Sequence, residues 1–288
     1  MSELKIGTCS WKYPSWSGLV YSAPKGIDYL AEYAQKYDSV EIDQWFWSLF
    51  EGRSVKLPDI ETVRNYKAAV PDSFKFTVKI PNSITLTHYY TKSKAGPLRT
   101  NPHFLSVDLF NEFISTLKPL EEMLGSMMFQ FEYLNHQKMQ SNQEFFNLFE
   151  NFAKKLPVGF RYAVELRNAN YLTDEYFEFL RRNKLDHVFL QGYWMPDIST
   201  IYHKGRDAFL ECEQVVIRLH GGDRKEIEEK AKQQWNKIVE PRDKELLSVT
   251  NMIKDLLNNE VDVYLNINNH YEGSAPLTID RIRALLAV

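Results

Sequence analysis

The chain has 288 residues, 44% of them hydrophobic, and a formal net charge of −3. This length can bury one large core, and the charge excludes a globally basic surface for binding nucleic acid. No apolar run reaches 18 residues, and the start MSELKIGTCSW lacks the pattern of a signal peptide. We therefore expect a cytoplasmic protein that has no membrane partner.

Short apolar runs alternate with amphipathic segments along the whole chain. The runs are 4–9, 39–43, 74–80, 126–131, 161–167, 187–192, 214–220 and 261–268. Helical spacing recurs between them, although residues 193–213 show no clean apolar stripe. Eight alternations that end in a helix predict an α/β fold: a single (β/α)8 TIM-type barrel with eight parallel strands, one domain over residues 1–288. A doubly wound sheet is the alternative, but no G-x-G-x-x-G motif follows the first strand.

The predicted strands contain more polar residues than strands buried on both faces usually do. Alternation turns Glu41 and Asp43 inward on the second strand, and one register per strand aligns further polar residues with them. Those are Lys75, Thr77, Lys79, Gln130, Glu165, Arg167, Gln191, Arg218, His220, Asn266 and Asn268. They occur late in the strands, where barrel enzymes hold their active sites. We favour a ligand pocket over the alternative, a network of charges that only neutralise one another.

Aromatic residues follow the predicted strands. They are Trp11, Trp16, Trp45, Trp47, Trp194, Tyr13, Tyr89, Tyr90, Tyr133 and Tyr271. Packing under long loops would explain roughly half of them, and the others would suit sugar rings or bases that stack on flat faces.

The third loop after a strand, at about 81–105, is long and basic. It contains Lys92, Lys94 and Arg99 together with His88 and His103, and it has no acidic residue. A solvated loop is one interpretation, and a lid that binds an anion such as phosphate is the other. The two cysteines, Cys9 and Cys212, are expected at opposite ends of the barrel as reduced thiols.

Six segments occur in order along nearly the whole chain: IGTCSWKYPSWSG, SVEID, FKFTVKIPNSITLTH, YAVELRN, VVIRLHGG and NINNHYEGSAP. Together they resemble the YecE-like family of uncharacterised TIM-barrel proteins, a domain-of-unknown-function family. The resemblance implies a single barrel with a pocket at these motifs, without an established biochemical function. The matching positions are Thr8, Trp11, Glu41, Lys79, His88, Glu165, Arg167, Arg218, His220, Asn268, Asn269 and His270.

The first functional hypothesis is an enzyme for a phosphorylated, sugar-containing or nucleotide-like ligand. Glu41 or Glu165, with a pKa raised by neighbouring carboxylates, would be the general acid or base, and His220 or His88 would shuttle a proton. The ligand-binding candidates are Thr8, Trp11, Lys79, His88, Arg167, Arg218, Asn268, Asn269 and His270.

Two further hypotheses use the same residues. One is a non-catalytic module that binds a nucleotide or single-stranded nucleic acid. The other is a metal-dependent hydrolase or isomerase, similar in fold alone to endonuclease IV and the sugar isomerases, with Glu41, Asp43, Glu165, His220 and His270 as metal ligands. Three nearby cations oppose a divalent metal, so the sequence requires no cofactor. It also leaves the oligomeric state open.

Overall fold

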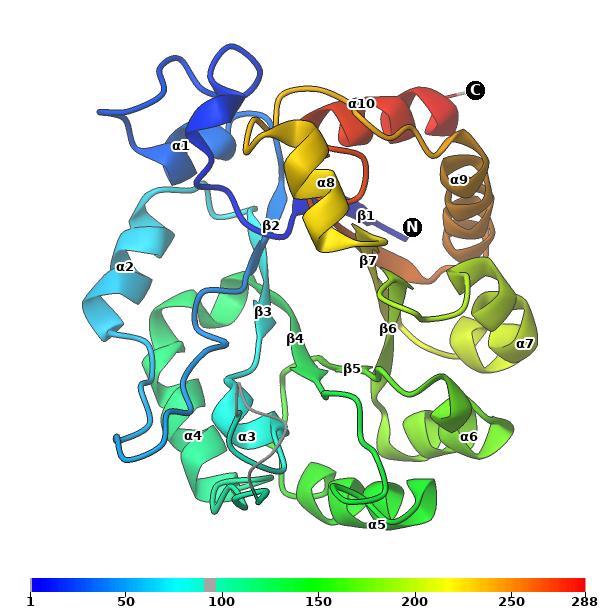
Figure 1. Cartoon of the computed structure of the whole chain (residues 1–288). Coiled ribbons are helices and arrows are strands. Elements are labelled where there is room, and N and C mark those ends of the chain that lie inside the picture. The colour runs from blue at the N-terminus through cyan, green and yellow to red at the C-terminus, as the bar shows by residue number, and fades with distance from the viewer. Residues whose placement is uncertain (1, 91–96, 288) are drawn as a thin grey trace.

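The computed structural model describes residues 2–90 and 97–287, and it has the predicted architecture (Figure 1). Eight parallel strands form one sheet in the order β1-β8-β7-β6-β5-β4-β3-β2. The strands are β1 (Leu4–Thr8), β2 (Ser39–Ile42), β3 (Lys75–Lys79), β4 (Leu124–Gln130), β5 (Tyr162–Glu165), β6 (Asp186–Gly192), β7 (Gln214–Gly221) and β8 (Asp262–Ile267). The edge strands β1 and β2 lie next to each other, so the sheet is a nearly closed TIM-type barrel.

Helices surround the strands and connect them. They are η1 (Pro14–Trp16), α1 (Tyr29–Tyr33), α2 (Ile60–Ala68), α3 (Asn82–Thr85), α4 (Val107–Thr116), η2 (Lys118–Met123), α5 (Asn142–Ala153), η3 (Ala169–Tyr171), α6 (Asp174–Asn183), α7 (Ile198–Leu210), α8 (Arg224–Ala231), α9 (Asp243–Asn258) and α10 (Ala275–Leu286). Several begin where a side chain accepts a hydrogen bond from the first turn, as Asp59 does from Thr62 and Ser106 from Leu109.

The segment without a clean apolar stripe forms α7, and its irregularity has a local cause. Gly205 interrupts the helix with non-helical backbone angles. A Cβ there would lie 2.8 Å from the ring of Phe209 and 2.9 Å from that of Phe177. Glycine therefore lets α7 approach α6 closely. The kink interrupts the regular helical spacing of apolar residues along this segment.

The hydrophobic core has two parts. The larger part fills the space between the strands and the surrounding helices. The smaller one, which we call the lower layer, comprises Met128, Ala163, Val188, Val216 and Tyr264. Strand register pairs Met128 with Ala163, and Val188 with Val216 and then Tyr264, so these side chains share the inner face of the barrel.

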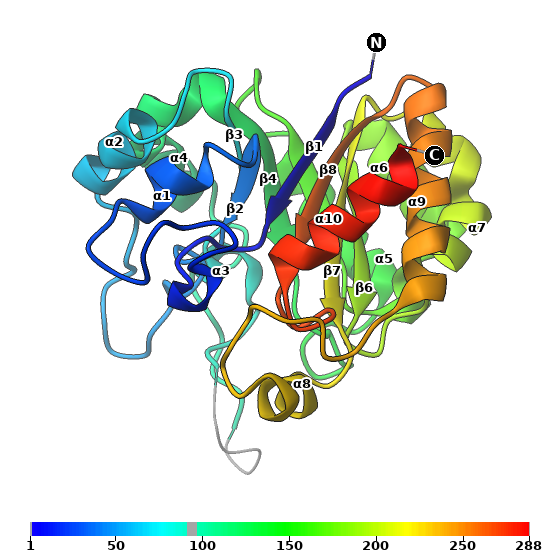
Figure 2. The same cartoon turned by 90° about the horizontal axis from the view of Figure 1, so that it is seen from above.

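The direction of the strands distinguishes the two ends of the barrel. The strands point toward α8, and both chain termini lie toward the opposite end (Figure 2). Cys9 follows β1 at the carboxyl-terminal end and Cys212 precedes β7 at the other, and both are unpaired as predicted. Within residues 2–90 and 97–287, no helix is both long enough and apolar enough to cross a membrane.

Candidate functional site at the carboxyl-terminal ends of the strands

Arg218 on β7 lies at the centre of the polar residues inside the barrel, and only 1% of it is exposed. Its guanidinium donates two hydrogen bonds to Glu41 on β2, at 2.8 and 2.7 Å, and another to Gln130 on β4 at 3.2 Å. It also forms a close ion pair with Glu165 on β5. These strands are not neighbours of β7 in the sheet, so the contacts cross the interior and confirm that the four side chains point inward.

Three further charged side chains surround this centre and are only partly buried. Arg167 lies 3.2 Å from the carboxylate of Glu165. The ammonium group of Lys79 lies 4.0 Å from the ring centroid of Phe46, and Asp43 follows the end of β2. We call Glu41, Asp43, Lys79, Glu165, Arg167 and Arg218 the charged cluster.

Two members of the charged cluster titrate near neutral pH. Burial and the neighbouring Glu41 carboxylate raise the pKa of Asp43 to about 6. Burial and the Arg218 guanidinium lower the pKa of Lys79 to about 8. Both shifts disfavour the charged form, so the cluster holds a carboxyl group and an amine that exchange protons close to neutrality.

The predicted rise in the pKa of Glu165 is wrong. Burial opposes the ionisation of this carboxyl group, but the cations of Arg218, Arg167 and Lys79 outweigh burial and hold its pKa below the ordinary value. Glu165 therefore remains ionised at neutral pH and is unsuited to act as a general acid. With Glu41, it serves to hold Arg218.

His220 is buried beside the charged cluster, and both of its ring nitrogens have partners. Nδ1 lies 3.0 Å from the hydroxyl of Tyr193, and Nε2 lies 3.5 Å from Sγ of Cys9. Burial and the Arg218 cation hold the pKa of His220 well below its ordinary value. The imidazole is therefore neutral and has no free nitrogen for the proton shuttle that the sequence suggested.

Gln191 and two family-like positions point elsewhere. The prediction that Gln191 faces inward is wrong, because its side chain donates to Glu245 of α9 at 2.9 Å. Its neighbour Leu190 pairs with Arg218 and takes the inward position. Thr8 contacts the Tyr33 hydroxyl of α1 at 3.0 Å, and Asn269 accepts a hydrogen bond from the first residue of α10 at 2.9 Å. Their contacts hold helices against the barrel.

His270, Asn268 and His88 lie on loops at the mouth. His270 contacts Asn268 through Nδ1 and Glu228 of α8 through Nε2, the latter at 3.1 Å. His88 contacts the hydroxyl of Thr87 at 2.9 Å. None of the hydrogen bonds described for these three side chains reaches the charged cluster.

The third loop is more ordered at its base than its length suggests. Residues 82–85 form the buried helix α3, and Asn101 donates to the carbonyls of Ser83 and Leu86 at 2.8 and 2.6 Å. Arg99 forms an ion pair with Glu51, whose carboxylate neutralises the charge of the guanidinium. Lys92 and Lys94, the other cations of the proposed anion-binding lid, lie outside the described residues.

A cavity of about 700 Å³ opens beside the charged cluster, and we call it the side cavity. Asp43 belongs to both, and Trp11 lines the cavity with its ring 5.1 Å from that of Tyr66. The sequence predicted Trp11 here but missed Tyr66 and Gln44. Tyr66 lies on α2, where nothing in a helical apolar stripe distinguishes a pocket residue from a core residue.

The aromatic residues that follow the strands differ in exposure, and Tyr13 and Tyr89 are half-buried. Trp16 and Tyr271 are fully buried, and Trp11 and Trp45 nearly so. Five others are exposed and form what we call the aromatic rim: Trp47, Phe50, Tyr90, Tyr133 and Trp194, of which Trp194 is 98% exposed.

The backbone beneath Trp194 is strained. Tyr193 and Trp194 both have positive φ angles, 55° and 68°, a conformation that costs a non-glycine residue about 1 kcal/mol or more. The guanidinium of Arg167 lies 4.7 Å from the ring centroid of Tyr193. The strained turn therefore extends from the charged cluster to the most exposed member of the aromatic rim.

The predicted metal ligands do not form a metal site. In residues 2–90 and 97–287, no three His, Cys, Asp or Glu side chains are grouped so that they could bind one ion. The carboxylates of Glu41 and Glu165 are directed at Arg218, and His220 is held by Tyr193 and Cys9. This donor set does not fit a divalent cation, because a guanidinium occupies the position between the two carboxylates.

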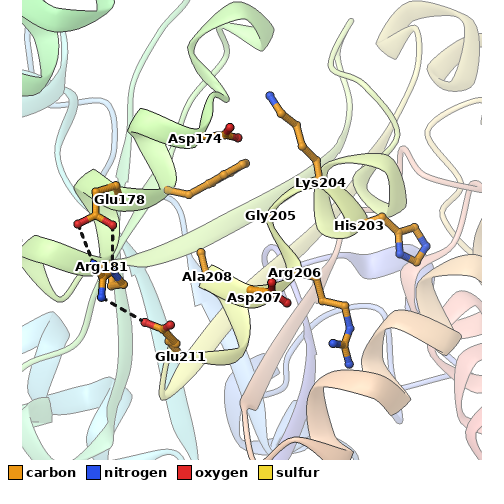
Figure 3. Close-up of a pocket in the computed structure, with 11 residues that line it drawn as sticks. Asp174, Glu178, Arg181, His203, Lys204, Gly205, Arg206, Asp207, Ala208 and Glu211 are labelled. Atoms are coloured by element: carbon orange, nitrogen blue, oxygen red, sulfur yellow. Dashed lines mark hydrogen bonds and ion pairs between the residues drawn. The ribbon is translucent and has the colours of Figure 1, made fainter.

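A second hollow, of about 400 Å³, lies on the outside of the barrel between α6 and α7 (Figure 3). Arg181 pairs there with Glu178 at 2.9 Å and with Glu211 at 3.7 Å. All of the lining comes from α6, α7 and Glu211, and none comes from a strand end. Its paired charges are typical of a solvated helix surface.

The fold and the charged cluster define a (β/α)8 barrel with polar chemistry at the strand ends. Residues 5–288 match the model of a family described as a protein of unknown function, DUF72. The chain therefore belongs to the DUF72 family, and the predicted membership of a domain-of-unknown-function family is confirmed.

Solved structures of DUF72 proteins agree with this fold. One from Enterococcus faecalis is 17% identical, with a TM-score of 0.68, and the match covers 99% of this chain and 96% of that one. Another from Thermotoga maritima is 19% identical, with a TM-score of 0.67 and coverage of 99% and 100%. At these identities the likeness shows the fold alone. No curated protein matches the chain.

Proposed function

We propose that this protein is an enzyme that acts on a polar, sugar-containing substrate at the mouth of the barrel. The main support is the distribution of exposed hydrophobic side chains. The large aromatic ones follow strand ends and make the aromatic rim, whereas the aliphatic ones lie on outer helices or in a loop that precedes a strand: Ile60, Leu148, Leu247 and Val158. Exposed aromatic faces gathered around a polar cluster are typical of a ligand site.

The charge balance favours a sugar over a nucleic acid. The charged cluster contains three carboxylates and three cations, and Arg99 outside it is paired with Glu51. A nearly neutral site gains little from a phosphodiester backbone, which binds mainly to unpaired cations. A polyol can instead exchange hydrogen bonds with both carboxylate and cationic groups.

Asp43 is the residue to which we assign proton transfer. It is half-buried, it contributes to both the charged cluster and the side cavity, and its pKa is raised to about 6. A carboxyl group of this kind can donate a proton and take it back near neutral pH, which a binding module does not need. Arg167 and Lys79 are the half-buried cations that would contact the bound substrate.

A thermal-shift screen with monosaccharides, disaccharides, sugar phosphates, a nucleotide and a single-stranded oligonucleotide tests the proposal. A sugar at one hundred times its Kd should stabilise the protein by about 2.7 kcal/mol. Trp194→Ala should weaken the apparent affinity for that sugar at least tenfold. Leu247→Ala on α9 is the matched control, since it also removes an exposed hydrophobic side chain, and it should leave the affinity unchanged.

The same screen separates the alternatives. Stabilisation by the oligonucleotide alone, with an affinity that falls steeply as salt rises, would replace the sugar enzyme with a nucleic-acid-binding module. Sugar binding without turnover, and with no effect of Asp43→Asn on any reaction, would make the protein a sugar-binding module. Equal effects of Trp194→Ala and Leu247→Ala would remove the aromatic rim from the site.

A further inference from the structure

Lys79 differs from the other cations of the charged cluster because no carboxylate forms an ion pair with it among the residues that the structure describes. Arg218 pairs with Glu41 and Glu165, and Arg167 pairs with Glu165. Among the residues that the structure describes, no hydrogen bond or ion pair ends on the Lys79 ammonium group, which lies over the Phe46 ring, 4.0 Å from its centroid. Glu41 and Glu165 are directed at Arg218, and Asp43 makes no described ion pair with Lys79.

Lys79 also lies where a bound substrate could reach it. It is the last residue of β3 and is only partly buried. The ring of Phe46, which its ammonium group contacts, lies 5.3 Å from that of Trp47 in an edge-to-face arrangement. Trp47 belongs to the aromatic rim, so the ring of Phe46 connects the amine of Lys79 with the rim.

We infer that Lys79 is a nucleophile that forms an imine with the open-chain aldehyde or ketone of a sugar-like substrate. This inference rests on the proposed function, and it specifies the substrate class as carbonyl compounds. The location of an unpaired, half-buried amine between the charged cluster and the aromatic rim is the geometry that supports it.

The reaction needs no oxidant or reductant. The uncharged amine of Lys79 attacks the carbonyl carbon, the carbonyl oxygen takes a proton, and a carbinolamine forms. The nitrogen then loses its second proton and the hydroxyl leaves as water, giving the imine. Asp43 is the group in the cluster suited to protonate the departing hydroxyl. The lowered pKa of Lys79 leaves about a tenth of the amine uncharged at pH 7, compared with under a thousandth for an ordinary lysine.

Reductive trapping tests the inference directly. The full-length protein is incubated at pH 7 with glycolaldehyde and cyanoborohydride, and the labelled peptides are quantified by mass spectrometry. Labelling of Lys79 should exceed that of Lys75 at least tenfold. Lys75 is the internal control because it lies at the other end of the same strand, where its ammonium group donates to the carbonyl of Glu122 at 2.8 Å. Ethylene glycol, which has the same skeleton without a carbonyl, should leave no adduct.

Lys79→Arg provides the second measurement. The substitution keeps a cation but removes the primary amine, so the dominant adduct should disappear. If sugars stabilise the wild-type protein but Lys79 is labelled no faster than Lys75, the imine is wrong and the proposed function stands. If no sugar stabilises the protein and Lys79 shows no excess labelling, both proposals fail.

Discussion

The inner face of the barrel changes character within two residues on each of four strands. Below, the lower layer has Met128, Ala163, Val216 and Tyr264; above, the same strands present Gln130, Glu165, Arg218 and Asn266. Apolar packing of the kind seen below is enough to fill a barrel of this size. The charged residues above must lose hydration to be there, so packing does not explain them.

The two half-buried titrating groups of the charged cluster make the stability of the fold depend on pH. The pKa of Asp43 is raised, so its contribution to stability is complete below about pH 4 and is lost as pH rises through about 6. The pKa of Lys79 is lowered, so its contribution is complete above its ordinary pKa and is lost as pH falls through about 8. Between about pH 6 and 8 both are charged, which is the least stable combination for burial but one suited to proton transfer.

The largest expected effect comes from replacing Arg218, which lies at the centre of the charged cluster. Arg218→Met leaves Glu41 and Glu165 buried without their cation, and we expect it to lower the free energy of unfolding by about 3–5 kcal/mol. Urea denaturation measures the change. The near-complete burial of all three side chains makes instability the first consequence of this substitution.

A matched variant distinguishes an unpaired charge from lost packing. In the triple variant Arg218→Met, Glu41→Gln, Glu165→Gln, the two charges are removed with their partner. Most of the lost stability should return, while sugar binding should not. A triple variant as unstable as the single one would mean that Arg218 acts by filling volume, and the contrast with the lower layer would disappear.

A smaller loss is expected from the lower layer. Met128 is fully buried inside the barrel, so Met128→Ala should destabilise the fold by about 3 kcal/mol through lost burial and a residual cavity. Calorimetric melting measures the loss. The affinity for sugar should stay within about twofold at a temperature where the variant is folded. A tenfold loss of affinity would show that the two layers are energetically coupled.

Asp43→Asn should change stability in the opposite direction. The wild-type protein should lose stability as pH rises from about 4 to 6, and the variant should lose this slope because the amide does not ionise. At pH 7 the variant is expected to be more stable by about 3 kcal/mol, the equivalent of the raised pKa. Urea midpoints at several pH values give both curves. Parallel curves would show that Asp43 titrates as an exposed carboxyl group does.

The sequence predicts those features of the fold and the site that depend on residues close together along the chain. All eight strands were predicted, because alternating apolar runs and helical stripes reflect nearby residues. Glu41, Glu165 and Arg218 were correctly placed inside the barrel by strand alternation. The same rule failed for Gln191, where Leu190 takes the inward position and the polar side chain finds a partner on α9.

The pairing of charges could not be predicted, because it depends on distances across the barrel. A raised pKa for Glu165 followed from counting carboxylates, but its proximity to Arg218 and Arg167 reverses the direction. Tyr66 reaches the side cavity from α2, and no spacing rule connects a residue of that helix with Trp11. Long-range geometry of this kind determines which predicted polar residues can titrate.

The smallest expected effect concerns the edge of the charged cluster. Cys9 is buried with its sulfur 3.5 Å from Nε2 of His220, and burial and the Glu41 carboxylate raise the pKa of its thiol well above the ordinary value. A neutral thiol in this position is a weak hydrogen-bonding group, so Cys9→Ala should cost about 1 kcal/mol and leave sugar binding unchanged. Cys9→Ser, which restores a hydrogen-bonding group next to His220, is the control. Loss of sugar binding in the alanine variant but not in the serine variant would extend the functional residues from Asp43 through Cys9 to His220. The functional side chains would then include one that follows β1.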